Sequence, residues 1–244
     1  MQQQASMPTE SLIGLHLNGR FFSRILCSPV DVNQLIVGWL FTHRLIESID
    51  EINTLGVCDD LTDVKVELAD ACLRRLDDYR PVTTSGCSGG EVAEQDYLGQ
   101  IRKVTSSARV DMSVIPGFMS AMFTRLRETC PTGGMHCASL IPIDNHSEML
   151  TGCDIGRHNA VDKAIGAALM GGADFGCSVL ATSGRISSDM VLKASRAGVP
   201  VVLSPRSVTT MAADLADRAD IVIVGRLSKP DRLITGNKKR ITGV

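Results

Sequence analysis

The sequence has few aromatic side chains and almost no net charge. Phe, Trp and Tyr make up 4% of the 244 residues, so few rings are present on which nucleic-acid bases could stack. Lys and Arg number 25 against 27 Asp and Glu, and the resulting net charge of −2 gives no overall field that attracts a polyanion. We therefore expect no nucleic-acid partner, and any anion site must be local.

Signatures of several other protein classes are also missing. No G-x-G-x-x-G follows a predicted strand and no Gly-Lys-Ser/Thr step occurs, which disfavours dinucleotide-dependent dehydrogenases and ATPases. The eight cysteines contain no C-x-x-C pair, the strongest sequence sign of zinc. No apolar run approaches the length of a bilayer span and the first residues do not resemble a signal peptide. We expect a cytoplasmic protein without membrane contact.

The residues that are present predict a folded α/β protein. Hydrophobic residues make up 44% and charged residues 21%, which is ordinary globular usage. Asn18-Gly19 predicts a hairpin over 12–26, because this pair suits a tight two-residue turn. Ser28-Pro29 predicts the start of a helix whose apolar stripe puts Trp39 in the core. Further elements are expected as strands at 52–57 and 64–68 and helices at 69–78 and 111–129.

After Gly152 short Val- and Ile-rich runs alternate with helical patterns. Strands are predicted at 178–181, 199–203 and 221–224, and helices at 157–170, 187–197 and 207–216. This alternation is typical of a parallel sheet covered on both faces, whose strand-following loops share one edge. Those loops carry Arg185, Arg206 and Arg226 among Ser, Gly and Pro. Such a composition suits phosphate oxygens, so we predict a phosphorylated ligand there.

A second glycine-rich region surrounds Cys87. Between residues 80 and 90 the chain is rich in Thr, Ser and Gly and predicts a mobile loop. An exposed thiol on such a loop could move between a sulfur donor and an acceptor, although an idle surface cysteine fits the composition equally well. For the other seven cysteines packing is the favoured role.

Two histidines stand out near predicted loops. His136 follows Thr132-Gly133-Gly134, and His158 follows Arg157 at the start of a predicted helix. Asp154 or Asn159 could cap that helix. We favour the turn 154–159 as a wall of the site, because adjacent Arg157 and His158 are hard to bury without a partner.

Taken in order along the chain, these motifs resemble the FdhD family of formate dehydrogenase accessory sulfurtransferases. The resemblance runs from about residue 10 to the C-terminus. Its most specific part is Gly156-Arg157-His158-Asn159-Ala160-Val161-Asp162-Lys163, and its other parts are the hairpin, Cys27-Ser28-Pro29, the Cys87 loop, Thr132-Gly133-Gly134-Met135-His136, Ser183-Gly184-Arg185-Ile186-Ser187 and Val224-Gly225.

The resemblance implies a function and a fold. Proteins similar to this one take persulfide sulfur from a cysteine desulfurase and pass it to the molybdenum or tungsten bis-guanine dinucleotide cofactor, which formate dehydrogenase requires. The cofactor is then a bound substrate, and the protein is an enzyme of the sulfurtransferase class. The implied fold is α/β, a cytidine deaminase-like three-layer α/β/α sandwich (111–244) with a smaller N-terminal α+β part that includes the Cys87 loop (1–110). A homodimer is also implied.

The resemblance also assigns residues. Cys87 becomes the persulfide cysteine and the turn 227–232 the cofactor-binding turn. Together with the residues inferred from the pattern, the expected cofactor-binding set is Leu227, Ser228, Lys229, Pro230, Asp231, Arg232, Arg185, Arg206, His136, Arg157 and His158. Two positions depart from the family pattern: Gly90 stands where many members have a second loop cysteine, and Asp231 stands where glycine is expected.

Two other functions remain open. A cofactor-binding chaperone without sulfur transfer would need the same basic edge but not Cys87. Zinc-dependent deamination is a poor alternative, because it needs His-x-Glu and Cys-x-x-Cys, and Ala138 stands where the Glu would be. His136, Cys137, Cys153 and His158 lack a short chelating spacing, so we expect no tightly bound metal.

Overall fold

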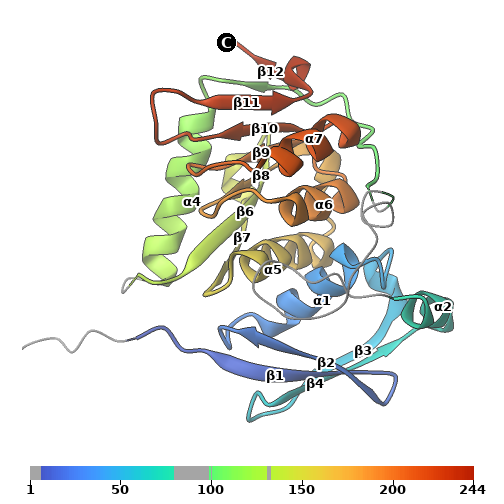
Figure 1. Cartoon of the computed structure of the whole chain (residues 1–244). Helices are drawn as coiled ribbons and strands as arrows, with labels where there is room; N and C mark the ends of the chain where they lie inside the picture. The colour runs from blue at the N-terminus through green and yellow to red at the C-terminus, as the bar shows by residue number, and fades with distance from the viewer. Residues whose placement is uncertain (1–6, 80–98, 100, 131–132) are drawn as a thin grey trace, which may run out of the picture.

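The computed structural model describes residues 7–79, 99, 101–130 and 133–244. Figure 1 shows the four-stranded and the six-stranded sheet with helices between and around them. The N-terminal sheet has the strand order β2-β1-β4-β3. It begins with the predicted hairpin: β1 (Ser11–Leu17) pairs antiparallel with β2 (Arg20–Cys27). Asn18 and Gly19 form the turn with φ of 49° and 75°, the left-handed values that favour these two residues. The hairpin is therefore confirmed.

The rest of this sheet follows the sequence pattern closely. β3 (Ile52–Val57) and β4 (Asp63–Leu68) form a second antiparallel pair, and β4 runs parallel to β1. A short helix α2 (Leu73–Asp77) follows. Helix α1 (Val32–Thr42) covers the inner face of the sheet, where Leu35 and Leu40 pack against Leu15 and Val66.

Two predictions about α1 need correction. The helix begins at Val32 with Asp31 at its N-cap, and not at Ser28-Pro29. Ser28 is instead used by a distant turn: its backbone N–H donates to Asp154 and its hydroxyl accepts from the Ile155 N–H. Trp39 is half-buried at the margin of the core, where its ring stacks on His43 with centroids 4.2 Å apart.

The larger sheet has the order β11-β10-β9-β8-β6-β7. Its strands are β6 (His136–Pro142), β7 (Leu150–Asp154), β8 (Ser178–Thr182), β9 (Val201–Leu203), β10 (Val222–Gly225) and β11 (Leu233–Gly236). β8, β9 and β10 are parallel, and β6, β7 and β11 are antiparallel to their neighbours. The predicted parallel strands are thus the centre of a mixed sheet.

Helices cover both faces of this sheet, as Figure 1 shows. On one face lie α5 (Arg157–Met170), α6 (Ser188–Ala197) and α7 (Thr210–Ala219), and on the other lies α4 (Ile115–Thr129). Alternate strand residues serve the two layers: Leu180 packs in the α5–α7 core, whereas Val179 and Ala181 pack in the α4 core. The predicted α/β class and its three-layer order are confirmed.

Residues 101–110 lie against the larger sheet. Val104 is buried in the α5–α7 core, and buried Arg240 donates to the carbonyls of Ser106 and Ala108. Val110 begins β5 (Val110–Asp111), which pairs with β12 (Ile241–Thr242). The division of the chain at residue 110 stays a prediction. No helix among the described residues is long and apolar enough to cross a membrane.

The two sheets are joined by a close crossing of α1 and α5. Gly38 and Gly166 lie at this crossing: a Cβ on Gly38 would be 1.8 Å from the Asp162 carbonyl oxygen, and one on Gly166 would be 1.9 Å from the Gln34 carbonyl oxygen. Both obstacles are helix backbone, which cannot move without separating the helices. The absence of a side chain at these two positions therefore sets how closely the two parts of the molecule pack.

We expect Gly38→Ala to destabilise the protein by about 2–3 kcal/mol, because the added methyl overpacks this crossing. Urea unfolding followed by circular dichroism measures the loss. Gly117→Ala is the matched control: Gly117 is an exposed residue of α4 with no neighbour within 4 Å of an added Cβ. There alanine is expected to stabilise by about 0.5–1 kcal/mol, since it lowers the entropic cost of the helix. Equal effects of the two substitutions would contradict the packing argument.

Candidate functional site

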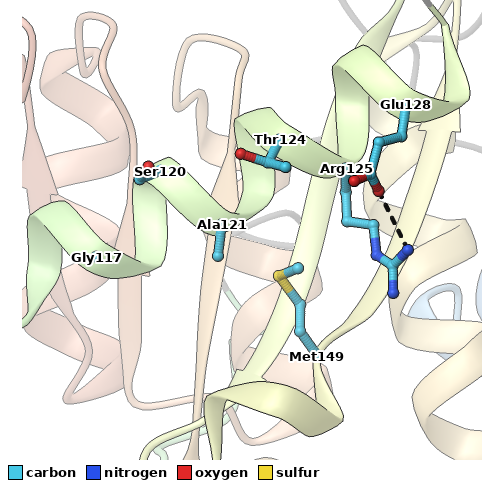
Figure 2. A pocket seen from close by; sticks show the side chains of 7 residues that line it. All are labelled: Gly117, Ser120, Ala121, Thr124, Arg125, Glu128 and Met149. Atoms are coloured by element: carbon cyan, nitrogen blue, oxygen red, sulfur yellow. Dashed lines mark hydrogen bonds and ion pairs between the residues drawn. The ribbon is translucent and has the colours of Figure 1, made fainter.

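A hollow of ≈ 570 Å³ lies on the outer side of α4 (Figure 2). Its lining includes the Arg125–Glu128 ion pair, whose atoms are 3.3 Å apart and whose side chains are more than half exposed. An exposed pair one helical turn apart is an ordinary surface feature. None of the predicted site residues lines this hollow.

The predicted site residues gather instead at one edge of the larger sheet. The carboxyl ends of β8, β9 and β10 share this edge because these strands are parallel. β6 is antiparallel to β8, and β7 to β6, so His136 at the start of β6 and Asp154 at the end of β7 reach it too. We call His136 and the residues 182–187, 204–206 and 225–228 the strand-end edge.

Hydrogen bonds join the loops of the strand-end edge to one another. The Ser204 hydroxyl donates to the Gly184 carbonyl (2.6 Å) and accepts from the Arg206 N–H (3.0 Å). The Arg226 N–H donates to the Arg206 carbonyl (2.8 Å), and the Leu227 N–H to the Ser204 carbonyl (3.2 Å). These bonds fix the loops after three different strands relative to one another.

Three guanidinium groups lie near enough to His136 for their charges to act on it. The pKa of His136 is lowered from its usual value by burial and then by the positive charges of Arg157, Arg206 and Arg185, in that order of effect. The His136 Nδ1 also lies 3.3 Å from the Ser183 hydroxyl. The structure therefore brings together four of the predicted binding residues, and their field disfavours any further positive charge.

Part of this cluster lacks protein partners. The Nε of Arg157 and the hydroxyl of Ser187 are buried, and within the described part of the chain neither has a hydrogen-bond partner. Arg157 packs against Gly184, where an added Cβ would lie 3.0 Å from the Arg157 Cβ. Burial and the nearby Arg185 charge lower the pKa of Arg157. Unmatched donors in a crowded positive cluster are suited to an anionic ligand.

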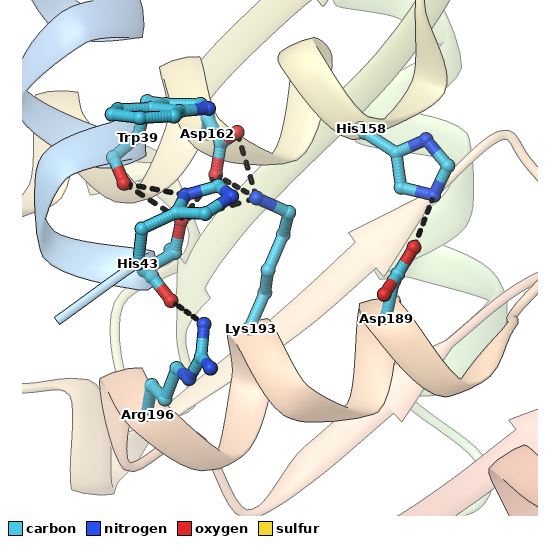
Figure 3. Close-up of polar contacts among 8 residues, drawn as sticks. Trp39, His43, His158, Asp162, Asp189, Lys193 and Arg196 are labelled. Atoms are coloured by element: carbon cyan, nitrogen blue, oxygen red, sulfur yellow. Dashed lines mark hydrogen bonds and ion pairs between the residues drawn. The ribbon is translucent and has the colours of Figure 1, made fainter. Parts of the chain in front are cut away.

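His158 lies behind this cluster and faces α6. Its Nε2 is 3.6 Å from the Asp189 Oδ2, as Figure 3 shows. Burial, followed by the charges of Arg157 and Lys193, lowers the pKa of His158 to about 4 despite the opposing effect of Asp189. His158 is therefore neutral at physiological pH and can serve as a hydrogen-bonding group without adding charge.

The lowered pKa of His158 makes a testable contribution to stability. Because the folded pKa lies below that of the unfolded chain, neutral His158 contributes stability above about pH 6.5. That contribution is lost as the pH falls toward about 4. We measure the unfolding free energy of the native protein and of His158→Asn by urea titration at pH 7 and at pH 5. Between these pH values the native protein should lose about 1–2 kcal/mol more than the variant. Parallel pH profiles for the two proteins would rule this out.

Below the cluster, α1, α5 and α6 share a buried ion pair that sequence reasoning missed. Lys193 Nζ lies 2.7 Å and 2.8 Å from the two carboxylate oxygens of Asp162 (Figure 3). The Thr42 hydroxyl donates to the same carboxylate. Asp189 was also missed as the partner of His158. The only sequence signal for Asp189 was its position in the first turn of a predicted helix, after Ser187. An acidic residue there also stabilises the helix N-terminus, so its position alone did not identify Asp189 as the partner of His158.

The turn 154–159 is divided between two roles. Asp154 is fully buried and accepts from the N–H groups of Ser28 and Gly156 and from the side chains of Asn159 and Lys163. Asn159 also donates to the Leu26 carbonyl (2.8 Å). Asp154 and Asn159 thus anchor the hairpin to α5, as the helix-capping alternative implied. Arg157 faces the strand-end edge, and His158 lies behind it against Asp189 of α6. The prediction of the whole turn as a site wall was too broad.

The turn 227–232 is connected to the strand-end edge. The Ser228 hydroxyl donates to the Pro205 carbonyl (2.8 Å), next to Arg206. Asp231, which departs from the family pattern, pairs with Arg226. Leu227 is half-buried, and Lys229, Pro230 and Arg232 are exposed. A role of this turn in binding stays a prediction.

The two remaining predictions concern metal and sulfur. Among the residues that the structure describes, no group of three or more His, Cys, Asp or Glu side chains is placed to hold a metal ion. A metal-free protein stays a prediction. Ala138, at the position where a deaminase would need Glu, is fully buried in β6. Cys87 lies outside the described residues.

Known proteins resemble this sequence over most of its length. The family model described as FdhD/NarQ matches residues 8–242. A sulfur carrier protein FdhD from Methanothermobacter thermautotrophicus is 30% identical over 234 residues, 91% of this chain and 89% of the relative. The protein of the same name from Bacillus subtilis is 30% identical over 223 residues, 90% and 84% of the two chains.

A solved structure has a similar fold. A crystal structure from Desulfotalea psychrophila, provisionally assigned as a formate dehydrogenase accessory protein, superposes with a TM-score of 0.75 at 26% identity. The match covers 96% of this chain and 89% of that one. The chain belongs to the FdhD/NarQ family.

Proposed function

We propose that the protein is a sulfur carrier that transfers persulfide sulfur from a cysteine desulfurase to the molybdenum or tungsten bis-guanine dinucleotide cofactor, for use by formate dehydrogenase. The relatives named as sulfur carrier proteins support the carrier role. The family resemblance supports the donor, the recipient, a homodimer and a cytoplasmic location. The enzyme class is a sulfurtransferase.

The guanidinium cluster at the strand-end edge is the main observation that supports binding of the cofactor. Arg157, Arg185 and Arg206 all raise the positive potential at His136, although the whole chain is slightly acidic. A ligand with pyrophosphate groups offers several anionic oxygens to such a cluster, and guanidinium forks bind phosphate strongly. A nucleotide-bearing cofactor fits this local charge.

The transfer half of the proposal rests on Cys87. In the loading step the Cys87 thiolate attacks the outer sulfur of the donor persulfide, the donor S–S bond breaks, and the donor leaves as a thiolate. Several described cysteines are poorly suited to this step. Burial raises the pKa of Cys27 to about 11, and a hydrogen bond that the exposed Cys177 thiol donates to the Asp174 carboxylate raises the pKa of Cys177. Thiols with raised pKa values contain little thiolate at neutral pH.

The loading step is tested by mass spectrometry. The full chain is incubated with a cysteine desulfurase and cysteine, and its intact mass is expected to rise by about 32 Da, one sulfur atom, per persulfide formed. Peptide mapping should place the added sulfur on Cys87. Sulfur on Cys27 or Cys153, with Cys87 unmodified, would overturn the assignment.

The binding half predicts the effect of removing a guanidinium group. Arg206→Ala is expected to weaken GDP binding by about 1.5–3 kcal/mol, the contribution of a charge-assisted hydrogen bond. Affinity should also fall as salt rises, because the attraction is largely Coulombic. Isothermal titration calorimetry measures both effects, and Arg125→Ala on the outer side of α4 is the control. Unchanged GDP affinity in Arg185→Ala, Arg206→Ala and Lys229→Ala alike would refute the placement of the site.

A further inference from the structure

Cys137 and Cys153 lie directly opposite each other in the antiparallel pair of β6 and β7. The Cys137 N–H donates to the Ser183 hydroxyl (2.9 Å), and the Cys137 carbonyl accepts from the Ser183 N–H (2.8 Å). Both backbone groups of Cys137 therefore point away from β7. The cysteines form a non-hydrogen-bonded pair, the kind in which Cα atoms lie about 4.5 Å apart and the side chains are closest.

The next pair of the same kind shows how near such side chains come in this hairpin. Ser139 and Thr151 are opposite each other two residues farther along, on the same face of the sheet, and their hydroxyl oxygens are 2.8 Å apart. A disulfide needs Cα atoms about 4.4–6.8 Å apart and Cβ atoms about 3.5–4.5 Å apart. A non-hydrogen-bonded pair such as Cys137 and Cys153, with Cα atoms about 4.5 Å apart, falls within the Cα range of a disulfide.

The two thiols also differ in reactivity. The interaction between the two thiols lowers the pKa of Cys153 and raises that of Cys137. A hydrogen bond from Thr129 and the charge of Lys163 lower the pKa of Cys153 further, against the effect of burial. Cys153 retains 6% exposure and Cys137 has none. Because only Cys153 keeps some exposure, it is the sulfur that an external disulfide reaches first, and Cys137 opposite it is placed to resolve the mixed disulfide.

We propose that Cys137 and Cys153 form a reversible dithiol/disulfide couple next to the strand-end edge, with a small disulfide such as oxidised glutathione as the oxidant. The Cys153 thiolate attacks one sulfur of the oxidant and releases a first thiolate. Cys137 then gives its proton to a thiolate, attacks the Cys153 sulfur and releases the second. The two cysteines lose two electrons, and the oxidant is reduced to two thiols.

The position of this couple links it to the site. Cys137 follows His136, and Cys153 precedes Asp154, so the disulfide would join the two strands where they present these residues. The couple does not depend on Cys87 or on the identity of the ligand. It adds a redox-responsive site to the proposed carrier function.

The experiment is a disulfide map of the full chain after exposure to oxidised glutathione. Thiols left free are alkylated in denaturant, and peptides are compared before and after reduction with dithiothreitol. The expected product is one disulfide linking Cys137 to Cys153. The mass of the oxidised chain should be about 2 Da lower than that of the reduced chain, and dithiothreitol should restore the original mass. Cys153→Ala should lose the cross-link, and Cys177→Ser, which removes an exposed thiol elsewhere, should keep it.

Three results would overturn the proposal. They are full alkylation of both cysteines after oxidation, a disulfide joining either of them to another cysteine, and a glutathione adduct that persists on Cys153. The native chain alone decides among these outcomes, so the result stands even where a variant fails to fold. Persulfide loading of Cys87 is a separate measurement, and its failure leaves this map unchanged.

Discussion

Formate dehydrogenase produced together with the Cys87→Ser chain is expected to show only the activity found without the protein. The reason is chemical: a serine hydroxyl is not ionised at neutral pH and cannot hold sulfane sulfur through an S–S bond. Gly90 replaces the second loop cysteine of many family members, so the same loop offers no substitute thiol. The measurement is formate oxidation by the dehydrogenase, after equal amounts of both chains have been confirmed.

A matched control separates loss of sulfur transfer from loss of a thiol. Cys177→Ser removes an exposed cysteine whose pKa is raised by Asp174, and it should leave the dehydrogenase fully active. GDP binding by Cys87→Ser should equal that of the native chain, because the guanidinium cluster is untouched. Full dehydrogenase activity with Cys87→Ser would favour the alternative function, a cofactor-binding chaperone without sulfur transfer.

The largest effect on stability is expected from Asp154→Ala. The side chains of Asp154 and Lys163 are 0% and 1% exposed, and their charged atoms are 2.8 Å apart. Removing the carboxylate leaves a buried ammonium ion without its counter-charge and removes the acceptor for the Ser28 and Gly156 N–H groups. We expect a loss of about 3–5 kcal/mol, the usual result of breaking a buried pair from one side. Urea unfolding measures it.

Two comparisons test the reason for that loss. Glu128→Ala breaks the exposed pair with Arg125 and is expected to cost less than about 0.5 kcal/mol. Asp154→Ala combined with Lys163→Met should be less destabilising than Asp154→Ala alone, because no buried charge is left unpaired. A cost of under about 1 kcal/mol for Asp154→Ala would show that the ammonium finds another partner or water.

Short-range signals in the sequence predicted much of the fold. The hairpin was predicted from Asn18-Gly19, and the bounds of α5 agree with the predicted 157–170. Both depend on residues a few positions apart, whose turn preference or helical spacing acts locally. The basic loops after β8, β9 and β10 were found for a related reason, since parallel strands present their carboxyl ends together.

Other features depended on contacts between distant segments. Ser28 was expected to begin a helix, but its polar groups are taken by Asp154 and Ile155. The sequence alone could not distinguish a capping or anchoring Asp154 from one that lines a site, because either role needs a polar residue before a helix. His158 and Asp189 likewise become neighbours only when α5 and α6 pack side by side.

Composition and local pattern were thus sufficient for the α/β class, most elements and the positive edge, because turns, helical stripes and strand ends depend on neighbouring residues. Tertiary structure decided which polar groups of the turn 154–159 anchor the fold and which face the strand-end edge. It also placed Cys137 opposite Cys153, since that pairing requires β7 to return antiparallel to β6 in one particular register. A shift of one residue would have moved every side chain of the strand to the other face.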